Sequence, residues 1–415
     1  MIAGSEILFI AHRVPFPPDR GDKIRSHHIL KALTKIAPVH VATFAESNSD
    51  LLMEAELAAV SASHCLVRRV KPLAAAGVEA LIRRCPISQT AFHSTELEAY
   101  IAHTLASRPI RAIYVFSGQM GMYLPSDWAG RTIIDLVDVD SAKFEAYGAL
   151  AGWPMSAIYR REGMLLAVEE RRLATVADRT LLVSEEEAEL LRSRVGDLPS
   201  SRIEALRNGI DSRQFDPAQI PVHEALEGSP GPHIVFTGQM DYLPNIAAAT
   251  RIIDNILPFL RKVYPAATFH CVGRDPAASL VARHGREGVR VWGQVPDVRA
   301  FLKSADLVLV PLEIARGVQN KVLEAMAMAC PVLLTPEAAG GIGAEEGAHY
   351  EIAGSDEELV SSAIALIANK TRATQMGAAA RQFVAEHLSW ETALRDLPAM
   401  LNLERGGVTG GAGYS

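Results

Sequence analysis

The chain has 415 residues, more than one ordinary hydrophobic core accommodates, which predicts two domains. Apolar residues make up 49% and charged residues 21%, as in ordinary globular proteins, and the net charge of −7 disfavours general nucleic-acid binding. No stretch approaches the ~20 apolar residues of a membrane span, and the N-terminal stretch lacks the basic start of a signal sequence. The four cysteines form no C-x-x-C pair, so their spacing indicates neither a zinc site nor a redox motif, and we expect reduced thiols in a cytoplasmic protein.

Short apolar runs alternate with longer helical patterns along the chain. The runs predicted as strands are 6–12, 39–45, 112–118, 131–139, 179–184, 233–238, 267–273, 289–294, 305–312 and 331–335. Their near-continuous hydrophobicity is typical of parallel strands covered on both faces. Intervening segments such as 23–36 and 245–264 repeat apolar residues at helical spacing. The alternation predicts an α/β protein with doubly wound, Rossmann-like domains.

A polar segment rich in Pro and Gly, 208–232, separates the two halves and predicts a linker between domains 1–207 and 233–390. A C-terminal helix is expected at 391–404, and the glycine-rich tail 405–415 is expected to be disordered. In such proteins ligands usually bind between the domains, beyond the carboxyl ends of the strands.

One predicted helix start gathers positive charge. Asn320 is the expected N-cap, and Arg316 and Lys321 add cations to the partly positive helix end. A diphosphate would balance this charge, and Gly317 would let the backbone approach it. Glu324, one turn into the helix, has a carboxylate suited to accept hydrogen bonds from vicinal hydroxyls. Alternatively, the loop is solvated and Glu324 forms a surface ion pair.

This helix resembles the signature of GT-B glycosyltransferases of the family 4, or group 1, class. The matching motifs, in chain order, are RNGID (207–211), FTGQMDYLPN (236–245), GQVPDVRAFLKSADLVLVP (293–311), LEAMAMACPVL (323–333) and HLSWETAL (387–394). A narrower likeness, to sugar transferases of bacterial exopolysaccharide and exosortase systems, rests on 12–33, 135–144 and 315–328. The resemblance implies two Rossmann-like domains facing a central cleft, with the acceptor bound by the first and a nucleotide-diphosphate sugar by the second. It also implies that no metal or other cofactor is needed for the diphosphate.

The chain departs from the family at two positions. Arg316 stands where the family has the first glutamate of its E-x7-E pair, whose second member matches Glu324, and Ala329 replaces a usual glycine. An arginine accepts no hydrogen bonds, so Arg316 is expected to pair with the diphosphate or with a carboxylate on the donor sugar. Many relatives carry a basic pair near Gly238 and Asn245, and none is present here. We therefore expect Arg316 and Lys321 to hold the diphosphate, with Gly238 and Asn245 near the donor.

The loop after the first strand is the expected acceptor side. Gly21 permits a tight turn, Lys23 and Arg25 are candidates to reach phosphate or acceptor, and His12 is the histidine expected nearest to the acceptor. An ordinary turn with exposed charges is the alternative.

Carboxylates end the strand predicted at 131–139. Asp138 is the candidate base that takes the proton of the acceptor hydroxyl if the enzyme inverts the anomeric configuration, whereas a retaining enzyme needs no such base. Alternatives are capping of the strand end and a divalent metal bound by Asp135, Asp138 and Asp140. Glycines at 340–347 do not have the spacing of a dinucleotide fingerprint and predict a turn.

The segment 66–88 mixes basic residues with an apolar helical pattern, which suits either an anionic membrane surface or core packing. Related enzymes often use lipid-linked acceptors, so a peripheral position on the inner face of the membrane is expected. The leading interpretation is a glycosyltransferase of bacterial exopolysaccharide or cell-surface glycan synthesis. A nucleotide-sugar epimerase of the same architecture and a non-catalytic subunit of a polysaccharide assembly are the alternatives.

Overall fold

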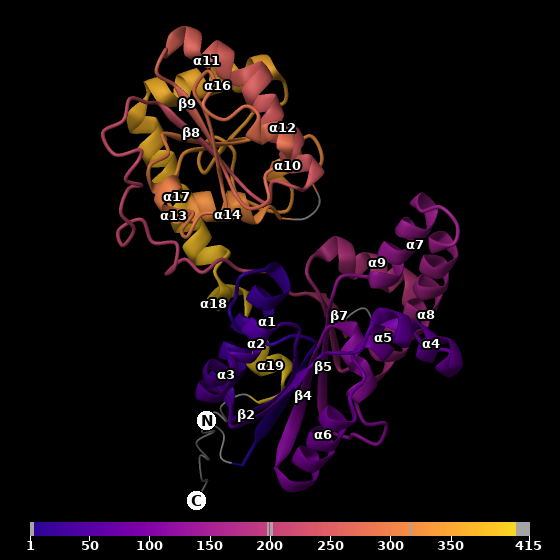
Figure 1. The fold of residues 1–415 in the computed structure, drawn as a ribbon. Helices are drawn as coiled ribbons and strands as arrows, with labels where there is room; N and C mark the ends of the chain where they lie inside the picture. The colour runs from indigo at the N-terminus through magenta and orange to yellow at the C-terminus, as the bar shows by residue number, and fades with distance from the viewer. Residues whose placement is uncertain (1–3, 197–198, 200–201, 316–317, 404–415) are drawn as a thin grey trace, which may run out of the picture. The chain divides into compact units, whose positions relative to one another are not determined.

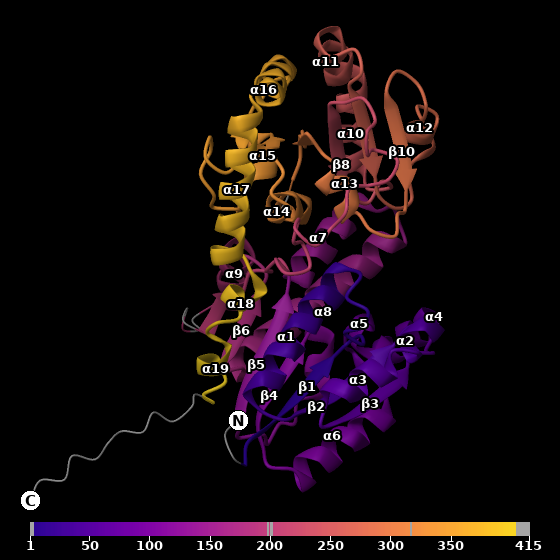
Figure 2. The same cartoon turned by 90° about the vertical axis from the view of Figure 1, so that its left-hand side faces the viewer.

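The computed structural model describes residues 4–196, 199, 202–315 and 318–403, and the chain divides into two compact units (Figures 1 and 2). Unit 1 comprises Met1–Asn208 together with Ala393–Ser415, and unit 2 comprises Gly209–Thr392. Each unit is an α/β layer structure with one parallel sheet. The predicted α/β class is confirmed, and each unit has a Rossmann-like doubly wound order of strands.

Unit 1 has a seven-stranded sheet of order β3-β2-β1-β4-β5-β6-β7, in which every pairing is parallel. Its strands are β1 (Glu6–Ala11), β2 (Val39–Ala45), β3 (Ser63–Arg68), β4 (Ile110–Phe116), β5 (Arg131–Val137), β6 (Arg179–Leu182) and β7 (Ile203–Ala205). The chain winds from β1 to β3 in one direction and then returns to add β4 on the other side of β1.

Helices cover this sheet. They are α1 (Gly21–Ile36), α2 (Asn48–Leu51), α3 (Glu54–Val60), α4 (Leu73–Arg83), α5 (Ile87–Ala91), α6 (Thr95–Ser107), the 3-10 helix η1 (Gly118–Tyr123), α7 (Asp140–Leu150), α8 (Met155–Val176), α9 (Glu185–Val195) and α19 (Leu397–Met400). Serine caps start several of them, because the hydroxyl accepts a bond from a free N–H of the first turn. Ser94 accepts from Leu97 at the start of α6, and Ser184 accepts from Glu187 at the start of α9.

Unit 2 repeats the plan with a six-stranded parallel sheet of order β10-β9-β8-β11-β12-β13. Its strands are β8 (His233–Thr237), β9 (Thr268–Val272), β10 (Val289–Gly293), β11 (Leu307–Val310), β12 (Val332–Leu334) and β13 (Glu351–Ile352). Its helices are α10 (Leu243–Arg251), the π-helix η3 (Ile252–Ile256), α11 (Leu257–Val263), α12 (Ala278–Val281), α13 (Arg299–Lys303), α14 (Asn320–Ala327), α15 (Pro336–Ala339), α16 (Asp356–Ala368), α17 (Lys370–His387) and α18 (Trp390–Ala393).

The central strands are buried on both faces, as their near-continuous hydrophobicity predicted. All seven residues of β2, all five of β8 and all four of β11 are buried. Each unit has its own hydrophobic core around these strands, so each excludes water without relying on the other.

The sequence did not reveal β3, β7 and β13, which all lie at sheet edges. An edge strand pairs on one side only and does not need continuous apolar residues. β3 contains no fully buried residue, and β7 and β13 have three and two residues. Leu66–Arg68 therefore belong to a strand, and helix within the predicted segment 66–88 begins at Leu73.

Two further predictions about the chain ends need correction or lie outside the structure. Two short helices, α18 and α19, occupy the range predicted as one helix at 391–404, because Pro398 lacks the N–H that a continuous helix would use. The tail 405–415 lies outside the described residues.

Within the polar segment 208–232, Ile210 and Leu226 are buried in the core of unit 2. No helix among the described residues is long and apolar enough to cross a bilayer.

Candidate functional site

The carboxyl edge of the unit 2 sheet has a switch point between β8 and β11, where the chain changes its direction of winding. Parallel sheets of this kind bind ligands beyond such a point. Gly238 follows β8 directly, Asn245 lies in the first turn of α10, and Lys321 lies in the first turn of α14, the helix after β11. Three of the predicted donor-site residues therefore lie at this position.

Two glycines bring backbones together beside these side chains. Gly238 and Gly273 have φ angles of +156° and +152°, which side chains rarely permit. A Cβ atom on Gly273 would lie 1.6 Å from the carbonyl oxygen of Gly238, and one on Gly238 would lie 2.9 Å from Asn245 Nδ2. The loops after β8 and β9 therefore touch through bare backbone, which leaves Gly238 beside Asn245 and Lys321.

Asn245 holds the ammonium group of Lys321 in place. Lys321 Nζ donates to Asn245 Oδ1 at 2.6 Å, and Asn245 Nδ2 donates to the carbonyl oxygen of Gln239 at 2.8 Å. The same ammonium lies 5.3 Å from the centre of the Phe236 ring. Among the described residues Lys321 makes one hydrogen bond with its three donors, so two remain to bind an anion.

Lys321 and Glu324 are both poorly solvated. Burial lowers the pKa of Lys321 to about 8 and raises the pKa of Glu324 to about 7, and in each case the opposite charge of the other residue resists the shift. The Glu324 carboxylate has no hydrogen-bond partner among the described residues. Near neutral pH a bound anion would therefore stabilise the charged form of Lys321, and hydroxyl donors would stabilise the charged form of Glu324.

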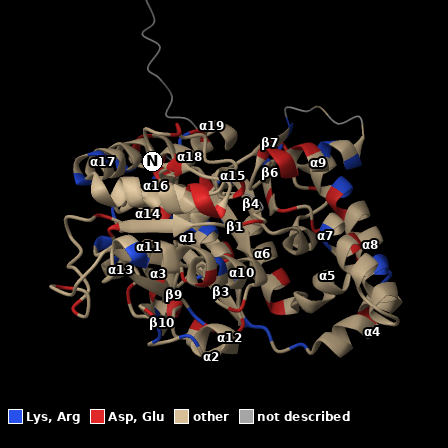
Figure 3. Cartoon of the chain, turned by 90° about the horizontal axis from the view of Figure 1, so that it is seen from above, with Lys and Arg blue, Asp and Glu red and all other residues tan. Residues whose placement is uncertain are grey.

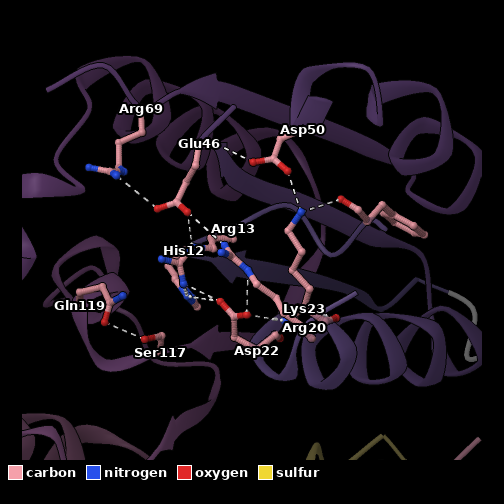
Figure 4. Close-up of polar contacts among 12 residues, drawn as sticks. His12, Arg13, Arg20, Asp22, Lys23, Glu46, Asp50, Arg69, Ser117 and Gln119 are labelled. Atoms are coloured by element: carbon pink, nitrogen blue, oxygen red, sulfur yellow. Dashed lines mark hydrogen bonds and ion pairs between the residues drawn. The ribbon is translucent and has the colours of Figure 1, made fainter. Parts of the chain in front are cut away.

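Unit 1 has a polar cluster beyond the carboxyl ends of β1, β2 and β3, beside the start of α1 (Figure 4). Arg13 donates to Asp22 at 2.5 Å and to Glu46 at 2.6 Å. Arg20 also donates to Glu46, at 3.0 Å, and Arg69 lies 3.3 Å from the same carboxylate. Three guanidinium groups thus face two carboxylates, and all five side chains are part-exposed. We call these five residues the arginine cluster.

His12 lies under the arginine cluster. Its Nε2 atom lies 3.2 Å from Asp22 Oδ2, and its ring stacks on Phe116 with 5.7 Å between ring centres. Burial lowers the pKa of His12 despite the nearby carboxylate, so the ring is neutral at pH 7. Burial raises the pKa of Asp22, but the bonds from His12 and Arg13 outweigh this and hold it well below its usual range.

Residues 231–369, most of unit 2, match the family model described as "Glycosyl transferases group 1". The matched region contains Gly238, Asn245, Lys321 and Glu324. Residues 231–369 are therefore similar to a group 1 glycosyl transferase domain. The search of curated proteins found no match to the chain.

Solved structures resemble the whole chain in fold. HepE from Anabaena, in complex with UDP, has a TM-score of 0.62 at 14% identity, covering 96% of this chain and 99% of its own. Sucrose-phosphate synthase from Thermosynechococcus elongatus has a TM-score of 0.62 at 15% identity, covering 96% and 98%. WaaG, a glycosyltransferase involved in lipopolysaccharide biosynthesis, has a TM-score of 0.60 at 16% identity, covering 97% and 100%. The fold is GT-B, and with the group 1 domain it supports a glycosyltransferase.

Within the group 1 domain, the start of α14 differs slightly from the prediction. Gln319, not Asn320, occupies the N-cap position, and no side-chain cap bond is formed there. Asn320 is the first helical residue and is exposed. No described side chain caps this turn, but the N–H of Val322 donates to the Gln319 carbonyl at 2.9 Å, so the N–H groups of Asn320 and Lys321 are those that would suit an anion. Arg316 and Gly317 lie outside the described residues.

Lys23 and Arg25, the predicted acceptor-side cations, are both held by partners inside unit 1. Lys23 is 4% exposed and donates to Asp50 at 2.6 Å and to the Phe16 carbonyl at 3.2 Å. Arg25 is 1% exposed and binds both oxygens of Asp135. The two residues are two positions apart and point to different sides of α1, so the start of this helix is enclosed on more than one side. Gly21 is exposed at the start of this helix.

Asp138 is half-exposed beyond the end of β5. The strand ends at Val137, before Asp138 and Asp140, and α7 begins at Asp140. Lys143 bridges the two carboxylates, at 3.3 and 2.9 Å. Asp135 is fully buried with Arg25, away from both. Among the described residues no group of three or more His, Cys, Asp or Glu side chains has the geometry of a metal site.

Most of the arginine cluster was missed by sequence reasoning. Arg13 and Glu46 directly follow predicted strands, so their position was a usable signal. Arg69 follows β3, an edge strand without a clear apolar pattern, and gave no such signal.

The close approach of Gly238 and Gly273 predicts that a side chain at position 273 destabilises the fold. Gly273→Ala is expected to lower the free energy of unfolding by more than ~2 kcal/mol, because the methyl group meets a carbonyl oxygen and φ is strained. Gly285→Ala is the matched control: φ is +79° there, but no atom lies within 4 Å, so strain of about 1 kcal/mol alone applies. Urea titration of both variants measures the difference, and equal losses would contradict the close approach.

The pKa shift of Lys321 makes a second prediction. At pH 8.5 the free domain holds this lysine mostly neutral, since its pKa is about 8. A bound diphosphate favours the charged form, so binding is expected to take up close to one proton there and to weaken as pH rises above 8. Calorimetry in two buffers of different ionisation enthalpy measures the uptake. In Lys321→Met the uptake should vanish, and an unchanged uptake would assign the proton to another group.

Proposed function

We propose that this glycosyltransferase takes its sugar from a nucleotide-diphosphate sugar held at the start of α14. The proposal rests chiefly on the ammonium of Lys321, which Asn245 positions at the switch point and which makes no second hydrogen bond among the described residues. The N-terminus of α14 adds partial positive charge, and Gly238 offers bare backbone beside it. Together these groups would stabilise the negative charge that develops on the departing diphosphate, without a metal or other cofactor.

The remaining donor contacts follow from charge. Glu324 would accept hydrogen bonds from hydroxyl groups of the ribose or the sugar, which would compensate its burial. Arg316 would pair with the diphosphate or with a carboxylate of an acidic donor sugar. Turnover of a donor panel by Arg316→Ala separates the two, and an unchanged profile and KM would remove Arg316 from the site. HepE, a structural neighbour, has been solved with UDP and with UDP-glucose, which makes uridine donors the first to test.

For the acceptor we propose unit 1. The arginine cluster has three cations for two anions, which favours an acceptor that carries phosphate, such as a lipid-linked saccharide. Asp138 is the proposed base if the reaction inverts configuration, because its half-exposed carboxylate remains reachable beside Lys143. His12 would position the cluster through Asp22.

We further propose that the enzyme works at the inner face of the membrane in exopolysaccharide or cell-surface glycan synthesis, attached through 66–88. Within that segment α4 exposes Leu73, Leu81 and Ile82 by 69%, 65% and 78%. Arg84 follows the helix and is exposed as well. Apolar residues and cations on one exposed helix favour anionic lipid. WaaG, another neighbour in fold, is named for lipopolysaccharide biosynthesis.

The test combines binding with product analysis. Calorimetry with UDP, GDP and ADP should show one preferred nucleotide, and absence of binding to all would favour a non-catalytic subunit. Incubation of the preferred donor with and without a lipid-linked saccharide should give glycosylated product only with the acceptor. Conversion of the donor to an epimer without any acceptor would instead show an epimerase.

A further inference from the structure

The tip of the α7–α8 hairpin in unit 1 exposes large apolar side chains. Leu150 and Trp153, at the turn between α7 and α8, are both 87% exposed. Tyr147, Met155 and Ile158 on either side of the turn are 47%, 42% and 40% exposed. Single exposed apolar residues are ordinary, but five within twelve residues of one turn concentrate apolar surface at the hairpin tip.

The charge around this tip is one-sided. Residues 146–159 contain no charged side chain, and Arg160 and Arg161 follow them directly. Arg160 is exposed and has no ion-pair partner among the described residues. The nearest acids are already engaged: Glu145 binds Arg194 at 2.7 Å, and Glu162 accepts from the backbone of Ser88 at 2.9 Å. An uncharged tip with the exposed cation of Arg160 at its base fits a lipid bilayer, which has an apolar interior and anionic headgroups at its surface.

The hairpin is held rigidly, so its exposure is not an effect of loose packing. Gly148 lets α7 approach α8 so closely that a Cβ atom there would lie 2.9 Å from Arg160 Cγ and 3.3 Å from the Arg160 backbone nitrogen. At the other end, Glu170 of α8 accepts from the backbone and the hydroxyl of Ser141 at the start of α7, at 2.8 and 2.5 Å. The tip is therefore presented on a fixed support.

The same hairpin is tied to α4. Arg161 donates to the carbonyl oxygens of Ala80 and Cys85, at 2.8 and 3.3 Å, which joins α8 to the end of α4. Figures 1 and 3 both show α4 beside α8. Arg161 lies two turns from Trp153 along the chain, so the hairpin tip and the exposed residues Leu81 and Ile82 of α4 belong to one region of unit 1.

We propose that the α7–α8 tip inserts into the interface of an anionic lipid bilayer, with Trp153 and Leu150 as the buried anchors. A protein partner would require a complementary concave surface, whereas a convex tip of Trp, Tyr and aliphatic residues above arginines suits the headgroup region, where amphipathic rings and cations are stable. The inference extends the proposed membrane attachment from α4 to a second element that the sequence pattern did not indicate. The vesicle binding predicted below does not depend on the proposed function, which supplies only the biological reason for the attachment.

Vesicle binding tests it. The full chain is mixed with vesicles of phosphatidylcholine alone or with phosphatidylglycerol added, and bound protein is separated by flotation. We expect binding that requires phosphatidylglycerol, a blue shift of tryptophan fluorescence, and loss of that shift in Trp153→Phe, which should still bind. Trp153→Glu should weaken binding about tenfold or more, because it removes one anchor and adds a repelled charge. Arg160→Glu should weaken binding as well.

Leu52→Glu is the matched control, since Leu52 is a 75% exposed leucine of the same unit outside this region, and it should bind as the parent does. Binding by Trp153→Glu equal to that of the parent would overturn the proposal, as would self-association that Trp153→Glu abolishes without any effect of vesicles. Nucleoside diphosphate binding, measured separately, should be the same in all variants. Its absence in the parent would defeat the proposed function while leaving the vesicle result valid.

Discussion

Lys321→Met is expected to weaken nucleoside diphosphate binding by about 10- to 100-fold without weakening the fold. A charge-assisted hydrogen bond is worth ~1.5–3 kcal/mol, and methionine keeps the length and packing of the chain without the charge. Burial lowers the pKa of this lysine, which means that the free protein holds the charge at a cost. Stability should therefore be unchanged or slightly higher in the variant, a combination that separates a binding residue from a structural one.

Calorimetry for affinity and urea titration for stability measure the two effects. Lys262→Met is the matched control, because Lys262 is also a lysine of unit 2 beside an aromatic ring, 4.3 Å from the centre of Phe259. It should bind the nucleotide as the parent does. Equal affinity of Lys321→Met and the parent would place the diphosphate elsewhere.

Arg25→Met is expected to lower the free energy of unfolding by ~3–5 kcal/mol. Removing the guanidinium leaves Asp135, which is fully buried, with the Tyr114 hydroxyl at 2.9 Å as its remaining side-chain donor. It also leaves the carbonyl oxygen of Leu206 without the bond that Arg25 donates at 2.6 Å. An unpaired buried charge is among the costliest changes available to a folded protein.

The double variant with Arg25→Met and Asp135→Leu identifies the cause. It should recover much of the loss, since no buried charge then lacks a partner. Arg194→Met removes an exposed partner of Glu145 and should cost about 1 kcal/mol or less. If Arg25→Met cost no more than this control, the pair would not support unit 1, and an acceptor role for Arg25 would be open again.

The sequence alone determined the fold class and indicated the place of the proposed donor site. Apolar runs long enough to be buried on both faces indicated the central strands of both sheets, because burial requires hydrophobicity whatever the neighbours are. Positive charge at a helix start after such a strand identified Lys321, since both features are local.

Only the tertiary structure decided which charged side chains face outward. Lys23 and Arg25 have the same sequence signal as surface cations, and the carboxylates that hold them inside, Asp50 and Asp135, are distant in the chain. The edge strand β3, and with it the position of Arg69, also depended on pairing with a neighbour instead of on its own residues. Packing also decides how much water reaches each side chain. It shifts the pKa values of Lys321 and Glu324 and leaves Trp153 exposed at the hairpin tip. The solvent exposure of a side chain cannot be derived from the sequence residue by residue.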